Sequence, residues 1–180
     1  MFTFVGQPFK KNDQDFGPWE ARKAAGDGGE FGGGLPQAFF TDNDKSMRCG
    51  QFGAIMRSFG IRYGFYDPKD WGKARYIDPI VDTFADVLNA QAAFAFAEDD
   101  AGREAGCTAY ENTVGKFMGL IEANMKHHGG KFAAGDSITI ADFVVAGHMQ
   151  ACSLNKASPM PFYGICQKVL PGHAAYQAYE

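Results

Sequence analysis

The hydrophobic and polar positions of the chain follow two patterns, which change near residue 66. After Asp67, apolar residues recur every three to four positions over long stretches, which is the period of an amphipathic helix. Before Asp67, short apolar runs alternate with clusters of Gly, Pro and Asp, which favour turns. The pattern therefore predicts a mixed α+β unit over residues 1–66 and an all-helical unit over residues 67–180.

The second region is predicted to hold four helices and a terminal amphipathic piece. The first expected helix starts at residue 67 or 70 and ends at residue 97. The next three helices span 104–127, 139–152 and 161–170, and the terminal piece covers 171–179. Pro79 should kink or split the first helix, because proline lacks a backbone donor and clashes with the preceding turn. Gly129 and Gly130 should end the second helix.

The strongest local signal is the start of the third helix. Thr139 is followed three residues later by Asp142, which is the spacing of a capping box with Asp in place of Glu. Ile138 and Phe143 flank this box and could pack together as a hydrophobic staple. The residues that follow are apolar nearly all round, so we expect a buried central helix around which the other helices pack.

The first region is predicted to contain one hairpin and two helical pieces. A strand over 35–40 opens with Pro36, a turn follows at 41–45, and a return strand covers 47–49. A helix is expected from Phe52 to Phe59, and residues 5–9 are read as a helix end that turns into a strand. The glycine-rich stretch 26–34 is predicted to be a mobile loop.

Composition narrows the function. The chain has 180 residues, is 46% hydrophobic and carries a net charge of −4, so a broad nucleic-acid-binding surface is not expected. No apolar run approaches the about 20 residues that cross a bilayer. The first residues lack the features of a secretory signal. We expect a cytoplasmic protein without a transmembrane segment, with a mitochondrial location as the alternative.

The cysteines and histidines do not predict a metal site. Cys49, Cys107, Cys152 and Cys166 form no CxxC pair and match no zinc spacing, so reduced thiols are expected. His127 and His128 suit a helix C-terminus better than a metal. A redox or haloacid-type enzyme that uses Cys49 is a further hypothesis, although no His or Asp is placed by the sequence to activate this thiol.

Several motifs together resemble the glutathione S-transferases, with the sigma-like branch the most similar. These motifs are Gly-x-Ser-Ile-Thr-x-Ala-Asp at 135–142, Trp-x-x-x-Lys at 19–23, Leu-Pro at 35–36, Gln-Phe-Gly-Ala-Ile-Met-Arg at 51–57, Val-Gly-Gln-Pro-Phe at 5–9 and Val-Leu-Pro at 169–171. The resemblance implies a thioredoxin-like, glutathione-binding-type domain over 1–66, incomplete because its first strand is missing, and an all-helical C-terminal domain over 67–180.

The resemblance also implies a glutathione site. Its residues would be Trp19, Lys23, Leu35, Pro36, Gln51 and Phe52. Trp19 and Lys23 would meet the glycyl carboxylate, and Leu35 would pair with the cysteinyl backbone through a cis-proline turn. Gln51 and the helix N-terminus after it would receive the γ-glutamyl head. The alternative for Trp19 is an aromatic at the core edge, and for Lys23 a solvated charge.

The sequence departs from this family at two positions that matter for chemistry. The activating Tyr, Ser or Cys of the first strand has no counterpart, and Thr3 is the one early hydroxyl. Phe52 stands where the family has a Ser after the Gln. Loss of this charge-assisted hydrogen bond should weaken glutathione binding by about 1.5–3 kcal/mol.

Two functions follow from the resemblance. The first is a glutathione S-transferase-like protein that binds glutathione as substrate and conjugates it to electrophiles. The second is a catalytically degenerate transferase fold that serves as a structural subunit of a larger assembly, with a mitochondrial assembly considered. The partner is accordingly a second copy in a homodimer or the subunits of such an assembly. The sequence leaves open whether the chain is an enzyme.

Overall fold

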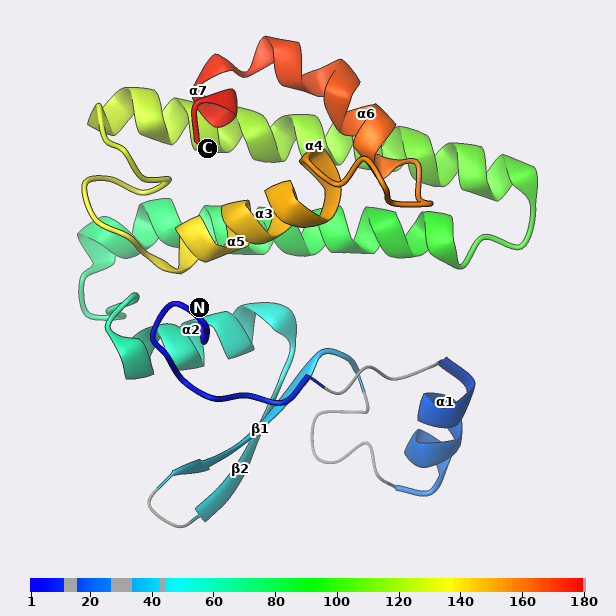
Figure 1. Cartoon of the computed structure of the whole chain (residues 1–180), viewed down its shortest axis with the longest axis horizontal. Coiled ribbons are helices and arrows are strands. Elements are labelled where there is room, and N and C mark those ends of the chain that lie inside the picture. Colours follow the sequence, from blue (N-terminus) through cyan, green and yellow to red (C-terminus); the bar gives the residue numbers. More distant parts are fainter. Residues whose placement is uncertain (12–15, 27–33, 43–44, 180) are drawn as a thin grey trace. The chain divides into compact units, whose positions relative to one another are not determined.

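The computed structural model describes residues 1–11, 16–26, 34–42 and 45–179. The chain divides into two compact units, Met1–Tyr63 and Gly64–Glu180. The first unit contains helices and a small sheet, and the second is helical (Figure 1). None of the described helices combines the length and apolar character needed to cross a bilayer.

The first unit is built around a β-hairpin and a helix. Its elements are α1 (Phe16–Ala24), β1 (Gln37–Asp42), β2 (Lys45–Gly50) and α2 (Phe52–Tyr63). The strands pair antiparallel, with Gln37 opposite Gly50. The predicted hairpin is confirmed, although β1 begins at Gln37 and not at residue 35, and both strands extend into the turn expected at 41–45. The predicted helix at Phe52 is also confirmed and runs four residues past Phe59.

Aromatic rings form the small core of the first unit. Phe59 of α2 is 5% exposed, and its ring centre lies 4.7 Å from that of Phe2 and 5.1 Å from that of Phe40. Tyr63 stacks on Phe59 one turn further along α2. These rings join the N-terminal segment, β1 and α2. The strand expected after residue 6 is wrong, because residues 7–11 have no regular structure and follow a turn that ends at Gly6.

The second unit is organised by two long helices that run side by side (Figure 1). Its elements are α3 (Trp71–Ala95), α4 (Asp100–His128), α5 (Ile140–His148), a π-helical turn (Met149–Ser153), α6 (Phe162–Val169), a 3₁₀ turn (Leu170–Gly172) and α7 (Ala174–Gln177). The α5 helix packs on α3, and α6 and α7 pack on α4. Fully buried side chains such as Val87, Val114 and Phe117 fill the space between these helices.

Side-chain caps and proline geometry explain the helix ends. The Asp70 carboxylate accepts the N–H of Lys73 at 3.0 Å at the start of α3. The Asp99 carboxylate accepts the N–H of Gly102 at 2.7 Å, so α4 begins four residues before the expected Glu104. Of the two outcomes expected at Pro79, the split is wrong, because α3 is continuous there, and the kink stays a prediction. Pro79 is exposed, and the buried residues on both sides of it hold the helix by packing.

The prediction of a capped, buried helix at Thr139 is confirmed. The Asp142 carboxylate accepts the backbone N–H of Thr139 at 2.6 Å and its hydroxyl at 2.8 Å, and both parts of the capping box are present. The same carboxylate accepts the N–H of Ala133 at 2.8 Å and the hydroxyl of Tyr179. Phe143 packs edge-on against Phe65, and its staple contact with Ile138 stays a prediction.

An imidazole at the end of α5 lies inside this core. His148 is 1% exposed, with Nε2 3.1 Å from the Tyr110 hydroxyl and Nδ1 2.8 Å from the Tyr176 hydroxyl. A neutral imidazole has one donor and one acceptor, so one tyrosine donates to it and the other accepts from it. Burial lowers the pKa of His148 to about 4, which keeps the ring neutral at pH 7.

Candidate functional site

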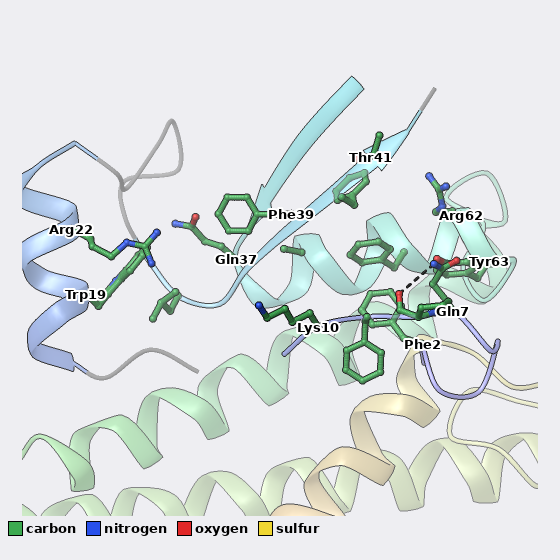
Figure 2. Close-up of a pocket in the computed structure, with 16 residues that line it drawn as sticks. Phe2, Gln7, Lys10, Trp19, Arg22, Gln37, Phe39, Thr41, Arg62 and Tyr63 are labelled. Carbon is green, nitrogen blue, oxygen red and sulfur yellow. Dashed lines mark hydrogen bonds between the residues drawn. The ribbon is translucent and has the colours of Figure 1, made fainter. Parts of the chain in front are cut away.

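The first unit encloses a cavity of about 630 Å³ between its N-terminal segment, α1, β1 and α2 (Figure 2). Seven aromatic side chains line this cavity: Phe2, Phe9, Trp19, Phe39, Phe40, Phe59 and Tyr63. A volume of this size and a lining rich in aromatic side chains are typical of small-molecule sites. We therefore treat this cavity as the candidate functional site.

The charged side chains described around the cavity are all cationic. Lys10, Arg22 and Arg62 line it, and none of its described lining residues carries a carboxylate. Figure 2 shows Trp19 and Arg22 projecting together from α1, and the Arg22 guanidinium lies 5.5 Å from the centre of the Trp19 ring. A concave surface with cations alone attracts anionic ligands.

The structure brings two of the six sequence-predicted residues to this cavity. Trp19, which is 6% exposed, and Leu35 line it. Lys23, Pro36, Gln51 and Phe52 are not among its lining residues. The Leu35–Pro36 peptide bond is cis, as the resemblance implied. The binding role of all six residues stays a prediction.

Lys23 and Gln51 have other neighbours. Lys23 Nζ lies 2.5 Å from Glu20 Oε1 on the same helix. Gln51 adopts φ 69° directly before α2, and its Nε2 lies 3.5 Å from where a Cβ atom would stand on Gly34. The Gln51 amide is therefore beside the segment that leads into Leu35, outside the cavity wall.

Sequence reasoning missed the cations of the cavity. Arg22 follows Trp19 by three residues on α1, so the two share a helix face, and this spacing was available in the sequence. Lys10 and Arg62 come from segments far apart in the chain, and no local pattern connects them. Gln37 also lines the cavity and donates from Nε2 to the carbonyl of Gly34 at 3.1 Å.

Few described residues offer a group that could activate a thiol here. Thr41 and Tyr63 are the two hydroxyl-bearing residues among those described around the cavity, and the exposed Thr3 does not line it. Cys49 also lies outside the cavity wall, and its Sγ is 3.7 Å from the Ser58 hydroxyl. This neutral neighbour gives no reason to assign Cys49 a catalytic role. Within the part of the chain that the structure describes, no three His, Cys, Asp or Glu side chains gather as a metal site.

Comparison with known protein families finds one match, which lies in the helical unit. Residues 85–165 match the family model described as "Glutathione S-transferase, C-terminal domain". No curated protein sequence matches the chain.

Solved structures share the fold over nearly the whole chain. The structure of prostaglandin synthase D of Nilaparvata lugens matches with 18% identity and a TM-score of 0.65, covering 99% of this chain and 86% of that one. The glutathione S-transferase from Ascaris lumbricoides matches with 22% identity and a TM-score of 0.67, covering 99% and 80%. The Fasciola hepatica sigma class GST matches with 20% identity and a TM-score of 0.58, covering 97% and 83%.

Proposed function

We propose that this chain is a glutathione S-transferase-like protein whose first unit binds glutathione in the described cavity. Two findings support this: residues 85–165 match the model of the glutathione S-transferase C-terminal domain, and the chain shares the fold of solved transferases. The observation that carries the proposal is the position of Trp19, Arg22 and Leu35 around one cationic cavity. Glutathione is a tripeptide with two carboxylates, so it suits a site lined by Lys10 and Arg22.

The cavity supports binding better than catalysis. Conjugation needs the thiolate, and a thiol with a pKa of about 8.5 must have a hydrogen-bond donor or a cation near its sulfur to ionise at neutral pH. Thr41 and Tyr63 are the described hydroxyl candidates, and the ring of Tyr63 is stacked on Phe59 in the aromatic core. We therefore propose a glutathione-binding protein with weak or absent transferase turnover.

Calorimetric titration of the full chain with glutathione tests this function. Arg22→Ala removes a cavity cation and should weaken binding about 10-fold, because a hydrogen bond to a charged group contributes about 1.5 kcal/mol or more. Lys23→Ala is the matched control on the same helix, because Lys23 pairs with Glu20 and does not line the cavity. Absence of binding at millimolar glutathione would contradict the proposal. A larger effect of Lys23→Ala than of Arg22→Ala would contradict the assignment of Arg22.

A second candidate function is a catalytically degenerate fold that acts as a subunit of a larger assembly. Its first unit exposes several large apolar side chains, each between 44% and 63% exposed: Phe4, Phe9, Leu35, Phe39, Met47 and Ile61. A contiguous patch of exposed apolar side chains is typical of protein contacts, and this candidate requires that these side chains form one. This candidate predicts that the chain co-migrates with a large complex in native extracts of its source. Migration as a free monomer or dimer would count against it.

A further inference from the structure

The helical unit has a cavity of its own beside the end of α5. Its volume is about 470 Å³, which is within the range of small-molecule sites. The wall is formed by the π-helical turn that follows α5, by α6, by the 3₁₀ turn and by α7. We call it the helical-unit cavity. Its described lining is apolar at Met149, Leu154, Leu170 and Pro171, and polar but uncharged at Ser153, Gln167 and Gln177.

The elements around the helical-unit cavity pack on one another. The α6 helix contacts both the π-helical turn and the 3₁₀ turn, and α7 contacts the 3₁₀ turn. After α7 the described chain leads away from the cavity, because Tyr176 bonds His148 at the end of α5 and Tyr179 bonds Asp142 near its beginning. The wall is therefore made by packed elements of a single unit.

Two glutamine carboxamides in this wall are held by backbone carbonyls. Gln167 donates from Nε2 to the carbonyl of Ser153 at 2.9 Å, which satisfies an acceptor at the end of the π-helical turn. Gln177 donates from Nε2 to the carbonyl of Leu170. Within the described residues, neither Oε1 accepts a hydrogen bond. Each carboxamide therefore keeps one acceptor and a second N–H for a ligand.

The Ser153 hydroxyl is buried without a hydrogen-bond partner of normal geometry. Ser153 is 1% exposed, and Cys166 and Tyr176 lie near its Oγ without completing such a bond. A buried polar group without a partner costs stability, so a ligand that supplies one gains by it. Rotation about the Cα–Cβ bond of Ser153 would turn Oγ from these neighbours toward the cavity that this residue lines.

The lining determines the chemical class of the ligand. None of the seven described lining residues is charged, so an ion would lose hydration on entry without gaining a partner. A primary amide carries donors and an acceptor on one planar group, which is the complement of a glutamine carboxamide. Leu154, which is 54% exposed, offers an apolar surface beside these polar groups.

We propose that the helical-unit cavity binds a small neutral molecule that carries a primary amide on an apolar body. The amide N–H groups would donate to Oε1 of Gln167 or Gln177, and the amide carbonyl would accept from their second N–H or from Ser153. The apolar body would lie against Met149 and Leu154. This site shares no described lining residue with the cavity of the first unit, so the inference is independent of glutathione binding.

Methyl NMR of the full chain tests this inference at the cavity itself. Met149 lines the helical-unit cavity, so its isotope-labelled methyl group reports on a ligand there, and Met149→Leu assigns its signal. The probes are benzamide, benzoate and benzylammonium, which share a ring and differ in charge. We expect benzamide to shift the Met149 signal with at least about 5-fold higher affinity than either ion. The signal of Met47 on β2, which is not among the described lining residues of either cavity, should stay unchanged.

Variants then assign the hydrogen bonds. Gln177→Leu should weaken benzamide binding at least about 5-fold, because leucine has a similar size and neither donates nor accepts. Gln167→Leu repeats the test from α6. Gln150→Leu is the matched control, since Gln150 is exposed in the π-helical turn and is not among the lining residues. Circular dichroism establishes that each variant is folded.

Three results would overturn the inference. The first is a Met149 signal that benzamide does not shift up to its solubility limit. The second is equal affinity for benzamide and for either ion, and the third is unchanged benzamide affinity in both Gln177→Leu and Gln167→Leu. Glutathione, which carries two carboxylates, should leave the Met149 signal unshifted, and a shift would contradict the selection of neutral ligands. Calorimetry with glutathione measures the proposed function separately, so either proposal can fail without the other.

Discussion

Asp142 accepts four hydrogen bonds although its side chain is almost completely buried. Its partners are the backbone and hydroxyl groups of Thr139, the N–H of Ala133 and the hydroxyl of Tyr179. Burial, together with the neighbouring carboxylate, raises the pKa of Tyr179, so this hydroxyl remains a donor. One carboxylate therefore joins the start of α5 to the preceding loop and to the region after α7.

Asp142→Ala should lower the free energy of unfolding by about 3 kcal/mol, because several buried donors lose their acceptor at once. Thr139→Ala should cost about 1 kcal/mol, the usual value for a lost N-cap. Asp136→Ala, in the same loop but exposed, is the control and should change stability by less than about 0.5 kcal/mol. Urea unfolding measures all three, and equal effects of Asp142→Ala and Asp136→Ala would contradict the role of Asp142.

His148 should make stability depend on pH. Its pKa falls from 6.5 to about 4 in the folded state. Between pH 6.5 and pH 4, the imidazole is therefore protonated in the unfolded chain and neutral in the folded chain. Stability is therefore lost as the pH falls below 6.5, by about 3 kcal/mol at pH 4, since one pKa unit corresponds to about 1.4 kcal/mol. Tyr110, Tyr176 and Cys166, which lie around it, stay neutral in this window because burial raises the pKa of each.

The His148→Gln variant tests this dependence. Its unfolding free energy should change less between pH 6.5 and pH 4 than that of the wild type, because the titrating imidazole is gone. His127→Gln removes an exposed histidine and should keep the wild-type slope. Urea unfolding at several pH values gives the slopes, and an unchanged slope in His148→Gln would refute the assignment.

The buried polar residues of the helical unit differ in how far the sequence alone predicts their contacts. Thr139 and Asp142 were predictable because a capping box is local, with both partners three residues apart. His148 was not, because its partners Tyr110 and Tyr176 lie 38 and 28 residues away in the chain. Only the fold makes this histidine a buried, neutral group.

At the scale of elements, α3 and α4 approach each other closely at a glycine. A Cβ atom on Gly106 of α4 would lie 2.7 Å from the backbone of Phe94 in α3, a distance that side-chain carbons do not tolerate. Gly115 on the same helix has room, since its Cβ would lie 3.7 Å from Val169 Cγ1. The first glycine is required by packing and the second is not.

Gly106→Ala should therefore destabilise the chain by about 2 kcal/mol through overpacking. Gly115→Ala, the matched variant, should be neutral or raise stability by up to about 1 kcal/mol, because alanine favours the helix. Thermal unfolding of both variants compares them directly. A higher melting temperature for Gly106→Ala than for the wild type would show that the helices can separate at this point.

The elements themselves were largely predictable, and their exceptions have physical causes. Hydrophobic periodicity was sufficient to locate α4, α5 and α6, because this signal lies within each helix, although the start of α4 was expected four residues too late. The continuity of α3 through Pro79 was not predictable, since tertiary packing maintains the helix despite a residue that disfavours it. The cations of the cavity belong to separate segments, so no pattern within one element could bring Lys10 together with Arg62.

At the scale of the whole molecule, the two units differ in how much core each has. Residues 64–180 contain nearly all of the fully buried side chains, including Val87, Val114 and Phe117. Residues 1–63 contain a two-stranded sheet, and such a sheet is marginally stable without more strands or a large apolar partner. The stability of the chain should therefore reside mainly in the helical unit.

A fragment of residues 64–180 should fold cooperatively, whereas a fragment of residues 1–63 should show little fixed structure. Below about 70–80 residues a single small core rarely provides more than 3–5 kcal/mol. Far-ultraviolet circular dichroism and urea titration of each fragment measure this difference. A cooperative transition in the fragment of residues 1–63 would contradict it.

The two tyrosines that contact α5 have a consequence for the order of synthesis. Tyr176 and Tyr179 bind His148 and Asp142, which precede them by 28 and 37 residues. A ribosome therefore produces α5 well before it produces these hydroxyl groups. The nascent chain must either keep this helix hydrated or leave its imidazole and carboxylate without these partners until translation has passed Tyr179. The native core of the helical unit can consequently close only after Tyr179 has been synthesised.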